Sequence, residues 1–78
     1  MTPNQLGTII RHERKRQGLT QPNLALISGS GVRFIVDVEH GKETCQIGKI
    51  LKLLNSLGLD IDVVTKRMRS HPKMDEQS

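Results

Sequence analysis

The segment from Gly31 to Gly41 carries three charged side chains, Arg33, Asp37 and Glu39, within an otherwise largely apolar run, and the first two are four residues apart. On a helix, residues four apart lie on the same face, so this pair can point together away from the apolar side chains. An arginine displayed in this way can donate paired hydrogen bonds to the two acceptors at the edge of guanine. The pattern therefore predicts recognition chemistry, in which Asp37 orients Arg33 in preference to accepting from a cytosine amino group.

The chain lacks the arrangements that are typical of catalysis and of metal binding. It has no Gly-rich phosphate loop, no paired catalytic carboxylates and no Ser/His/Asp spacing, and its three histidines lack the spacing of metal ligands. We therefore expect no enzyme, no cofactor and no metal site. The single cysteine, Cys45, cannot form an internal disulfide, which favours the reducing cytoplasm. No apolar run approaches the roughly 18 residues of a membrane span, so no membrane partner is expected.

Length and charge narrow the remaining possibilities. The chain has 78 residues, enough for one small domain, and carries 12 Lys and Arg against 8 Asp and Glu, for a net charge of +4. A net positive charge favours a polyanionic partner. A domain of this size buries a smaller fraction of its surface than a larger one does, so self-association is a plausible source of additional stability.

Glycines and capping residues mark the ends of the first two predicted helices. The first is apolar in its N-terminal half, from Leu6, charged over residues 11–16, and ends at Gly18, a residue that favours the left-handed C-terminal conformation. Thr20 is a good N-cap for a short second helix over residues 21–28. Leu19 and Leu24, on either side of this cap, have the spacing of a hydrophobic staple.

The next two helices are predicted from the spacing of their apolar residues. The third lies between residues 31 and 41, buries Phe34, Ile35 and Val38 and displays the polar side chains opposite them; by residue type, Ser30 is its N-cap. The fourth spans about 45–57, with Thr44 as its cap. Its apolar face is predicted to contain five residues at helical spacing: Ile47, Ile50, Leu51, Leu54 and Leu57.

A short strand is predicted after the fourth helix, because residues 59–65 alternate between apolar and polar types. Leu59, Ile61 and Val63 would share one face. A single strand needs a partner, and the economical partner is the same strand of a second copy, paired across a two-fold axis. We therefore expect a DNA-binding and dimerisation domain over residues 1–68, once the motif below is included, and a disordered polar tail over 69–78.

Two short helices joined by a glycine-containing turn suggest a helix-turn-helix, whose second helix enters the major groove of DNA. The residues that carry a family resemblance are spread over three quarters of the chain. They are Leu6-Gly7, Ile10-Arg11, Arg14, Gly18-Leu19-Thr20-Gln21, Leu24-Ala25, Gly29, Ile35, Glu39, Gly41 and Leu57-Gly58. With them the chain resembles the XRE/Cro-type helix-turn-helix family. The runs Arg33-Phe34-Ile35, Glu39-His40-Gly41-Lys42, Ile50-Leu51, Leu54 and Leu57-Gly58-Leu59 make it similar to the HipB-like antitoxin branch.

The resemblance implies a fold and a set of site residues. The fold is mainly all-α, a four- to five-helix, lambda-repressor-like domain whose C-terminal strand pairs across a homodimer. Arg14 and Glu39 match a structural ion pair, and Gln21 matches a glutamine that touches a phosphate and braces a base-reading side chain. The base-reading positions are Val32, Arg33, Val36 and Asp37. The phosphate-binding positions are Gln21, Gly31, His40, Lys42 and Thr44.

Two features of the third helix depart from the family pattern. The family register makes Gly31 the N-cap, one residue later than the choice of Ser30. Val32 and Val36 stand where hydrogen-bonding side chains are common in the family. They either contact thymine methyl groups or weaken base reading, and the sequence leaves both interpretations open.

The resemblance also implies partners. HipB-like proteins are dimeric repressors of their own promoters that bind a HipA-like kinase toxin encoded beside them, so we expect operator DNA, a second copy and such a toxin as partners, in the cytoplasm at the nucleoid. One alternative is a protein-binding module that mainly sequesters the toxin and binds DNA weakly. Another is a stand-alone repressor of the phage or restriction-associated type.

Overall fold

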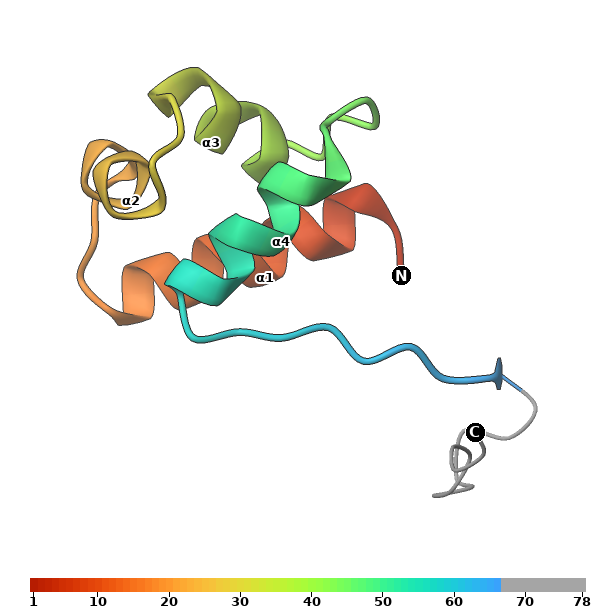
Figure 1. The fold of residues 1–78 in the computed structure, drawn as a ribbon. Coiled ribbons are helices and arrows are strands. Elements are labelled where there is room, and N and C mark those ends of the chain that lie inside the picture. The colour runs from red at the N-terminus through yellow and green to blue at the C-terminus, as the bar shows by residue number, and fades with distance from the viewer. Residues whose placement is uncertain (67–78) are drawn as a thin grey trace.

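Four helices pack around one core in the computed structural model, which describes residues 1–66 (Figure 1). The helices are α1 (Pro3–Arg16), α2 (Gln21–Ser28), α3 (Val32–Glu39) and α4 (Ile47–Ser56). The packing is centred on α3, which contacts both α1 and α2, while α2 also contacts α4. The predicted all-α helix-turn-helix architecture is confirmed.

The segment predicted as a strand follows α4 as an extended chain that leaves the helical body (Figure 1). Within residues 1–66 it has no β-partner, as expected for one chain considered alone, so strand pairing between two copies stays a prediction. The predicted tail over 69–78 lies outside the described residues. Among the helices of the described part, none is long and apolar enough to cross a membrane.

The first helix begins earlier than Leu6, where its apolar pattern starts. Thr2 is the N-cap, and its hydroxyl accepts a hydrogen bond of 3.1 Å from the Gln5 amide. The Gln5 side chain in turn accepts one of 2.8 Å from the Thr2 amide, which completes a capping box. Pro3 fits the first position, where an amide hydrogen would have no helical partner.

The second helix begins and ends where the local signals place it. Thr20 is its N-cap and forms a second reciprocal capping box with Asn23. Gly18, which closes α1, has a φ of +73°, and Gly29, which closes α2, has a φ of +70°. A side chain at either position would strain the backbone, because L-residues rarely adopt positive φ.

The prediction for the start of α4 is wrong. Its N-cap is Gln46, which makes no side-chain capping hydrogen bond, and Thr44 lies exposed in the preceding loop. A local capping signal is worth only about 1 kcal/mol. The burial of Leu53 and Leu54 from α4, and of Leu57 at its C-cap, outweighs it and determines where the helix runs.

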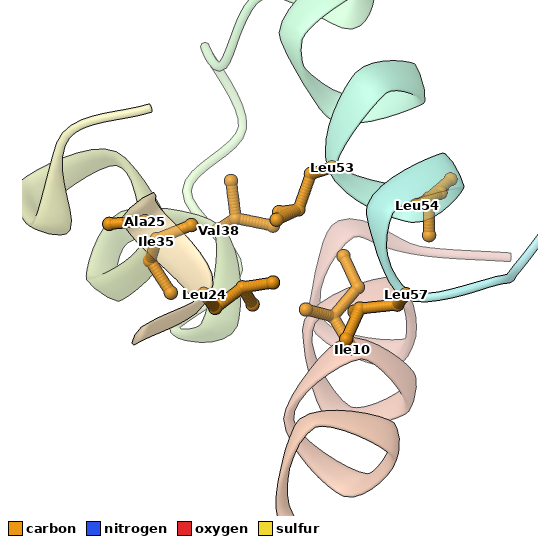
Figure 2. Close-up of a cluster of buried hydrophobic side chains, with 8 residues drawn as sticks. All are labelled: Ile10, Leu24, Ala25, Ile35, Val38, Leu53, Leu54 and Leu57. Carbon is orange, nitrogen blue, oxygen red and sulfur yellow. The ribbon is translucent and has the colours of Figure 1, made fainter. Parts of the chain in front are cut away.

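Eight apolar side chains from all four helices form the core (Figure 2): Ile10, Leu24, Ala25, Ile35, Val38, Leu53, Leu54 and Leu57. The face that α4 buries is shifted from the predicted one. Ile47 and Leu51 are 64% and 48% exposed, whereas Leu53, which was not predicted to be buried, is fully buried. The inward row is Ile50, Leu53, Leu54 and Leu57, another set at helical spacing, so periodicity alone did not distinguish the two faces.

The helices α1 and α3 meet at Gly7. A Cβ atom at this position would lie 2.4 Å from the carbonyl oxygen of Val38 and 2.8 Å from that of Glu39. Both are backbone atoms that cannot rotate away, so a side chain is excluded. This close approach places the last turn of α3 directly against α1.

Candidate nucleic-acid interface

The turn between α2 and α3 is short and internally satisfied. After Gly29, the Ser30 amide donates to the carbonyl oxygen of Ala25 at 2.9 Å, and the N-cap of α3 is Gly31. The choice of Ser30 as N-cap is therefore wrong. Ser30 instead lies 3.1 Å, hydroxyl to hydroxyl, from the buried Ser28, whose own hydroxyl donates to the Leu24 carbonyl at 2.8 Å.

One side of α3 fastens the helix to the core. Ile35 is fully buried and Val38 almost so, while Phe34 is half-buried with the Lys49 ammonium 5.7 Å from its ring centre. The buried side therefore agrees with the prediction, except that Phe34 keeps an exposed edge. This packing fixes which residues of α3 face outward.

The predicted base-reading residues form the outward side of α3. The Arg33 side chain is 85% exposed and Val32 is 42% exposed. Val36 and Asp37, one turn later, are half-buried. The side chains form two parallel rows at i,i+4 spacing, an apolar row of Val32 and Val36 and a charged row of Arg33 and Asp37. Their contact with bases stays a prediction.

Asp37 lies between two cations. Its Oδ1 atom is 3.3 Å from Arg33 Nε, and its Oδ2 atom is 3.5 Å from Lys42 Nζ. Each carboxylate oxygen thus faces one positive charge, which favours the orienting role for Asp37 over a free acceptor for cytosine. The contact with Arg33 uses Nε and leaves its two terminal amino groups, the pair that guanine would accept.

A buried ion pair lies behind this surface, where the family resemblance implied one. Arg14 Nε donates to Glu39 Oε2 at 2.6 Å, and Arg14 Nη2 donates to Glu39 Oε1 at 3.0 Å. The Arg14 and Glu39 side chains are only 8% and 2% exposed. Arg14 Nη1 also donates to the carbonyl oxygen of Leu19 at 2.9 Å, so the pair joins α1, the following turn and α3.

The Gln21 side chain contacts the buried ion pair in this structure, and its bracing of a base-reading side chain stays a prediction. Its side-chain nitrogen Nε2 donates to Glu39 Oε1 at 3.2 Å, and the residue is half-buried. The physical reason is the nearby carboxylate, because a hydrogen bond to a charged acceptor is stronger than one to a neutral group. Gln21 thus stabilises the scaffold, and contact with a phosphate stays a prediction.

The other four predicted phosphate-binding residues flank α3 at its two ends. All four are exposed, and Lys42 also contacts Asp37. Gly31 precedes the helix, and His40, Lys42 and Thr44 follow it. The His40 ring nitrogen Nδ1 lies 3.0 Å from the Val36 carbonyl oxygen. This placement suits contacts with the backbone on either side of a groove, and the contacts themselves stay predictions.

The three residues of the predicted dimer strand differ in their surroundings. Leu59 is half-buried against the core, and its amide donates to the Leu54 carbonyl at 2.8 Å. Ile61 and Val63 are 41% and 88% exposed. Two apolar side chains of the extended segment are therefore available to another surface.

A polar cluster that the sequence analysis missed ties the end of α1 to the end of α4. The side-chain nitrogen Nε2 of Gln17 donates to Glu13 Oε2 at 2.7 Å and to the Leu57 carbonyl oxygen at 2.9 Å. Hydrogen bonds from Arg16, and then from Gln17, lower the pKa of the Glu13 carboxyl from 4.5 to about 2. The contacts of Glu13 with Arg16 and Gln17 are local, whereas the link from Gln17 to Leu57 joins residues 40 positions apart and has no local signature.

No family model matches the chain. It is 51% identical over 63 residues to the uncharacterized HTH-type transcriptional regulator y4mF of Sinorhizobium fredii (strain NBRC 101917 / NGR234), which covers 81% of this chain and 83% of that protein. The chain belongs to the HTH-type transcriptional regulators.

Solved structures show the likeness of this HTH-type transcriptional regulator in its fold as well. A HipB-O4 20mer complex and a HipA-HipB-O2-O3 complex each contain a chain that matches it with a TM-score of 0.76 and 26% identity. Each match covers 83% of this chain and 92% of the other. The regulator thus has the DNA-binding fold of the HipB type, in which α2 and α3 are the helix-turn-helix.

Proposed function

We propose that the protein is a dimeric repressor that reads an operator with α3 and also binds a HipA-like kinase toxin. The observation that carries the proposal is the outward side of α3, where the exposed Arg33 contacts Asp37 and lies beside Val32 and Val36. The buried side of the same helix is fixed to the core through Ile35 and Val38. A rigidly held helix with a chemically varied outer face suits the major groove.

The charges around α3 support DNA rather than a neutral partner. Arg33 and Lys42 both remain more than half exposed although each contacts Asp37. Lys42 lies past the helix end, where it can meet the sugar–phosphate backbone but not the base edges. This division between reading and gripping residues is common in protein–DNA interfaces.

An apolar groove supports the proposal that two copies of the chain form a dimer. It has a volume of about 330 Å³ and lies between the start of α1 and the chain that leaves α4. Most of its lining is apolar, and Ile61 and the neighbouring Val63 are exposed beside it. A strand pair formed by residues 59–65 of two copies would give the extended segment the partner it lacks in one chain.

The kinase partner rests on similarity. A chain of this fold occurs in a HipA-HipB-O2-O3 complex, which supports a partner of the HipA type for this protein. The alternative, a module that mainly sequesters the toxin with weak DNA binding, is favoured by the two valines on α3, since they cannot donate hydrogen bonds to bases. A stand-alone repressor would lack the kinase gene next to its own.

Titration of the full chain against the duplex upstream of its own gene, and against a scrambled duplex, tests operator binding. We expect tighter binding to the native duplex by about 10³-fold or more, weakening as salt rises. Equal affinity for both duplexes would contradict the repressor and favour the sequestering module. Co-purification with any HipA-like kinase encoded next to this gene, with and without DNA, then tests the partner.

Sedimentation tests the dimer separately. The full chain should sediment as a dimer, and a chain ending at Gly58 should sediment as a monomer that binds the operator more weakly. A chain that lacks only residues 69–78 is the matched control and should remain dimeric. A dimer of unchanged operator affinity after the cut at Gly58 would contradict the role of residues 59–65.

A further inference from the structure

A second concave surface lies between α1 and the start of α2. Its volume is about 880 Å³, and it is bordered by His40 just after α3. Its lining includes Thr8, Arg11, Arg14 and Lys15 of α1, Gln21 of α2, and Glu39 of α3. None of the α1 residues among them belongs to the helix-turn-helix itself.

The charge of this groove is positive once its internal pairs are counted. Glu39 is its only carboxylate, and both oxygens of Glu39 already accept hydrogen bonds from Arg14. Arg11 and Lys15 remain exposed, and within residues 1–66 no carboxylate oxygen lies within 4.0 Å of either. The groove therefore holds two cations whose charge is not neutralised by the described part of the chain.

The positions of these two cations suit a linear anion. Thr8, Arg11 and Lys15 are spaced three and four residues apart, so they form one row along α1. Four residues of helix span about 6 Å, which places the two positive charges in a line rather than around one point. Such a row is better suited to two phosphates of one strand than to a single small anion.

The polar side chains at the start of α2 already have hydrogen-bond partners within the protein, which leaves anion binding in the groove to α1. The Gln21 amide nitrogen is engaged by Glu39 at 3.2 Å, and the Thr20 hydroxyl accepts from the Asn23 amide at 3.1 Å. Both side chains thus already have partners within the protein. Arg11 and Lys15 are the groove's long side chains that are still available to an outside ligand.

We propose that Arg11 and Lys15 bind the sugar–phosphate backbone of the operator, so that α1 extends the DNA contact beyond α3. The inference rests on the proposed function. Arginine and lysine form charge-assisted hydrogen bonds with phosphate oxygens, and neutralising phosphates contributes affinity without sequence preference. The groove would therefore strengthen binding to every duplex and leave the choice of sequence to α3.

The test compares the full-length variants Arg11→Ala, Lys15→Ala and the double variant with Lys52→Ala, which removes one exposed positive charge from α4. Dissociation constants are measured for operator and scrambled duplexes at several salt concentrations. Each groove variant should weaken binding to both duplexes about three- to tenfold. It should also make the slope of log affinity against log salt shallower by about 0.9 per protomer. Lys52→Ala should leave the slope unchanged.

Three outcomes separate the possibilities. Unchanged slopes for the groove variants, or slopes that change as much for Lys52→Ala, would overturn the inference. Competition by inorganic phosphate at constant ionic strength that disappears in the double variant would show a site for a free anion and would also overturn it. If the unmodified protein does not discriminate between the two duplexes, the proposed repressor function is contradicted. The inference about Arg11 and Lys15 remains testable in that case, because the salt slope is measurable on any duplex.

Discussion

Arg14 in α1 and Glu39 in α3 are joined by two parallel hydrogen bonds, of 2.6 Å and 3.0 Å, with both side chains almost completely buried. The pair lies one residue from His40, which borders the basic groove, and two residues from Asp37 on the outer side of α3. It thus fixes the C-terminal end of α3 against α1. The geometry is bidentate, the arrangement in which arginine binds a carboxylate most strongly.

Replacing one member of this pair should nearly unfold the protein. Glu39→Gln leaves the Arg14 charge buried without its counterion, which costs about 3–5 kcal/mol, against roughly 5 kcal/mol of total stability for a marginal small domain. Urea denaturation measures the loss. Glu13→Gln, which removes an acid from an ion pair nearer the surface, is the control and should shift the midpoint much less. A loss below about 1 kcal/mol for Glu39→Gln would show the pair to be peripheral.

Two glycines should respond in opposite ways to alanine. Gly7→Ala forces a methyl group onto the Val38 and Glu39 carbonyl oxygens, and we expect overpacking to cost about 1–3 kcal/mol. At Gly48, inside α4, an added Cβ would meet nothing within 4 Å. Gly48→Ala should therefore stabilise the protein by about 0.5–1 kcal/mol through higher helix propensity. Denaturation of both variants checks this, and equal effects would contradict the close approach of α1 and α3.

Substitutions of Arg33 and of Lys42 should distinguish base contacts from phosphate contacts. Arg33→Ala should cost about 1–3 kcal/mol on the operator and relax discrimination at one base pair per half-site. Lys42→Ala should weaken all sequences alike and make the salt slope shallower by about one unit per site. Titration of both variants with operator and scrambled duplexes at several salt concentrations tests the contrast. Equal losses on both duplexes for Arg33→Ala would show that Arg33 contacts phosphate.

The two valines on α3 should make binding sensitive to a methyl group. If Val32 or Val36 packs on a thymine, replacing that thymine by deoxyuracil removes one buried methyl, worth about 0.8 kcal/mol. Operator affinity should then fall about fourfold, and the loss should disappear in Val32→Ala or in Val36→Ala. Val64→Ala, outside the helix-turn-helix, should keep it. Indifference to uracil at every thymine of the half-site would show that the valines do not read methyl groups.

Stability should fall with acid in a way that depends on Glu13. Its pKa is lowered from 4.5 to about 2 in the folded state, so it stabilises the fold above pH 4.5. That contribution is lost as the pH falls from about 4.5 towards 2, because the unfolded state binds the proton first. Urea midpoints of the unmodified protein and of Glu13→Gln should converge over this range. A constant difference between the two would contradict the lowered pKa.

The sequence predicted the local parts of this molecule best. Thr20, Gly18 and Gly29 act through their immediate neighbours, and they placed the end of α1 and both ends of α2 correctly. Distant contacts had no such signal. Gln21 turns to Glu39, Gln17 reaches the Leu57 carbonyl and Leu53 replaces Leu51 in the core, each because of where another helix lies.

The two candidate surfaces differ in the same respect. The outer side of α3 could be predicted because one helix carries all of it, and helical periodicity separates its buried and displayed residues. For the groove beside α1, the sequence shows Arg11 and Lys15 four residues apart on one helix, but it does not show that they border a groove, because the start of α2 and His40 complete that groove only through packing. Thr44 failed as a cap for a related reason, since the path of its loop depends on where α4 packs.

The clean division of α3 also bears on how such proteins diversify. Ile35, Val38 and Glu39 hold the helix in place, while Val32, Arg33 and Asp37 take little part in the core. If the outer residues read bases as proposed, exchanging them would change the target sequence and leave the core contacts of α3 in place. A duplicated gene would then need only a few substitutions on one helix for its product to stop binding the target sequence of the original protein.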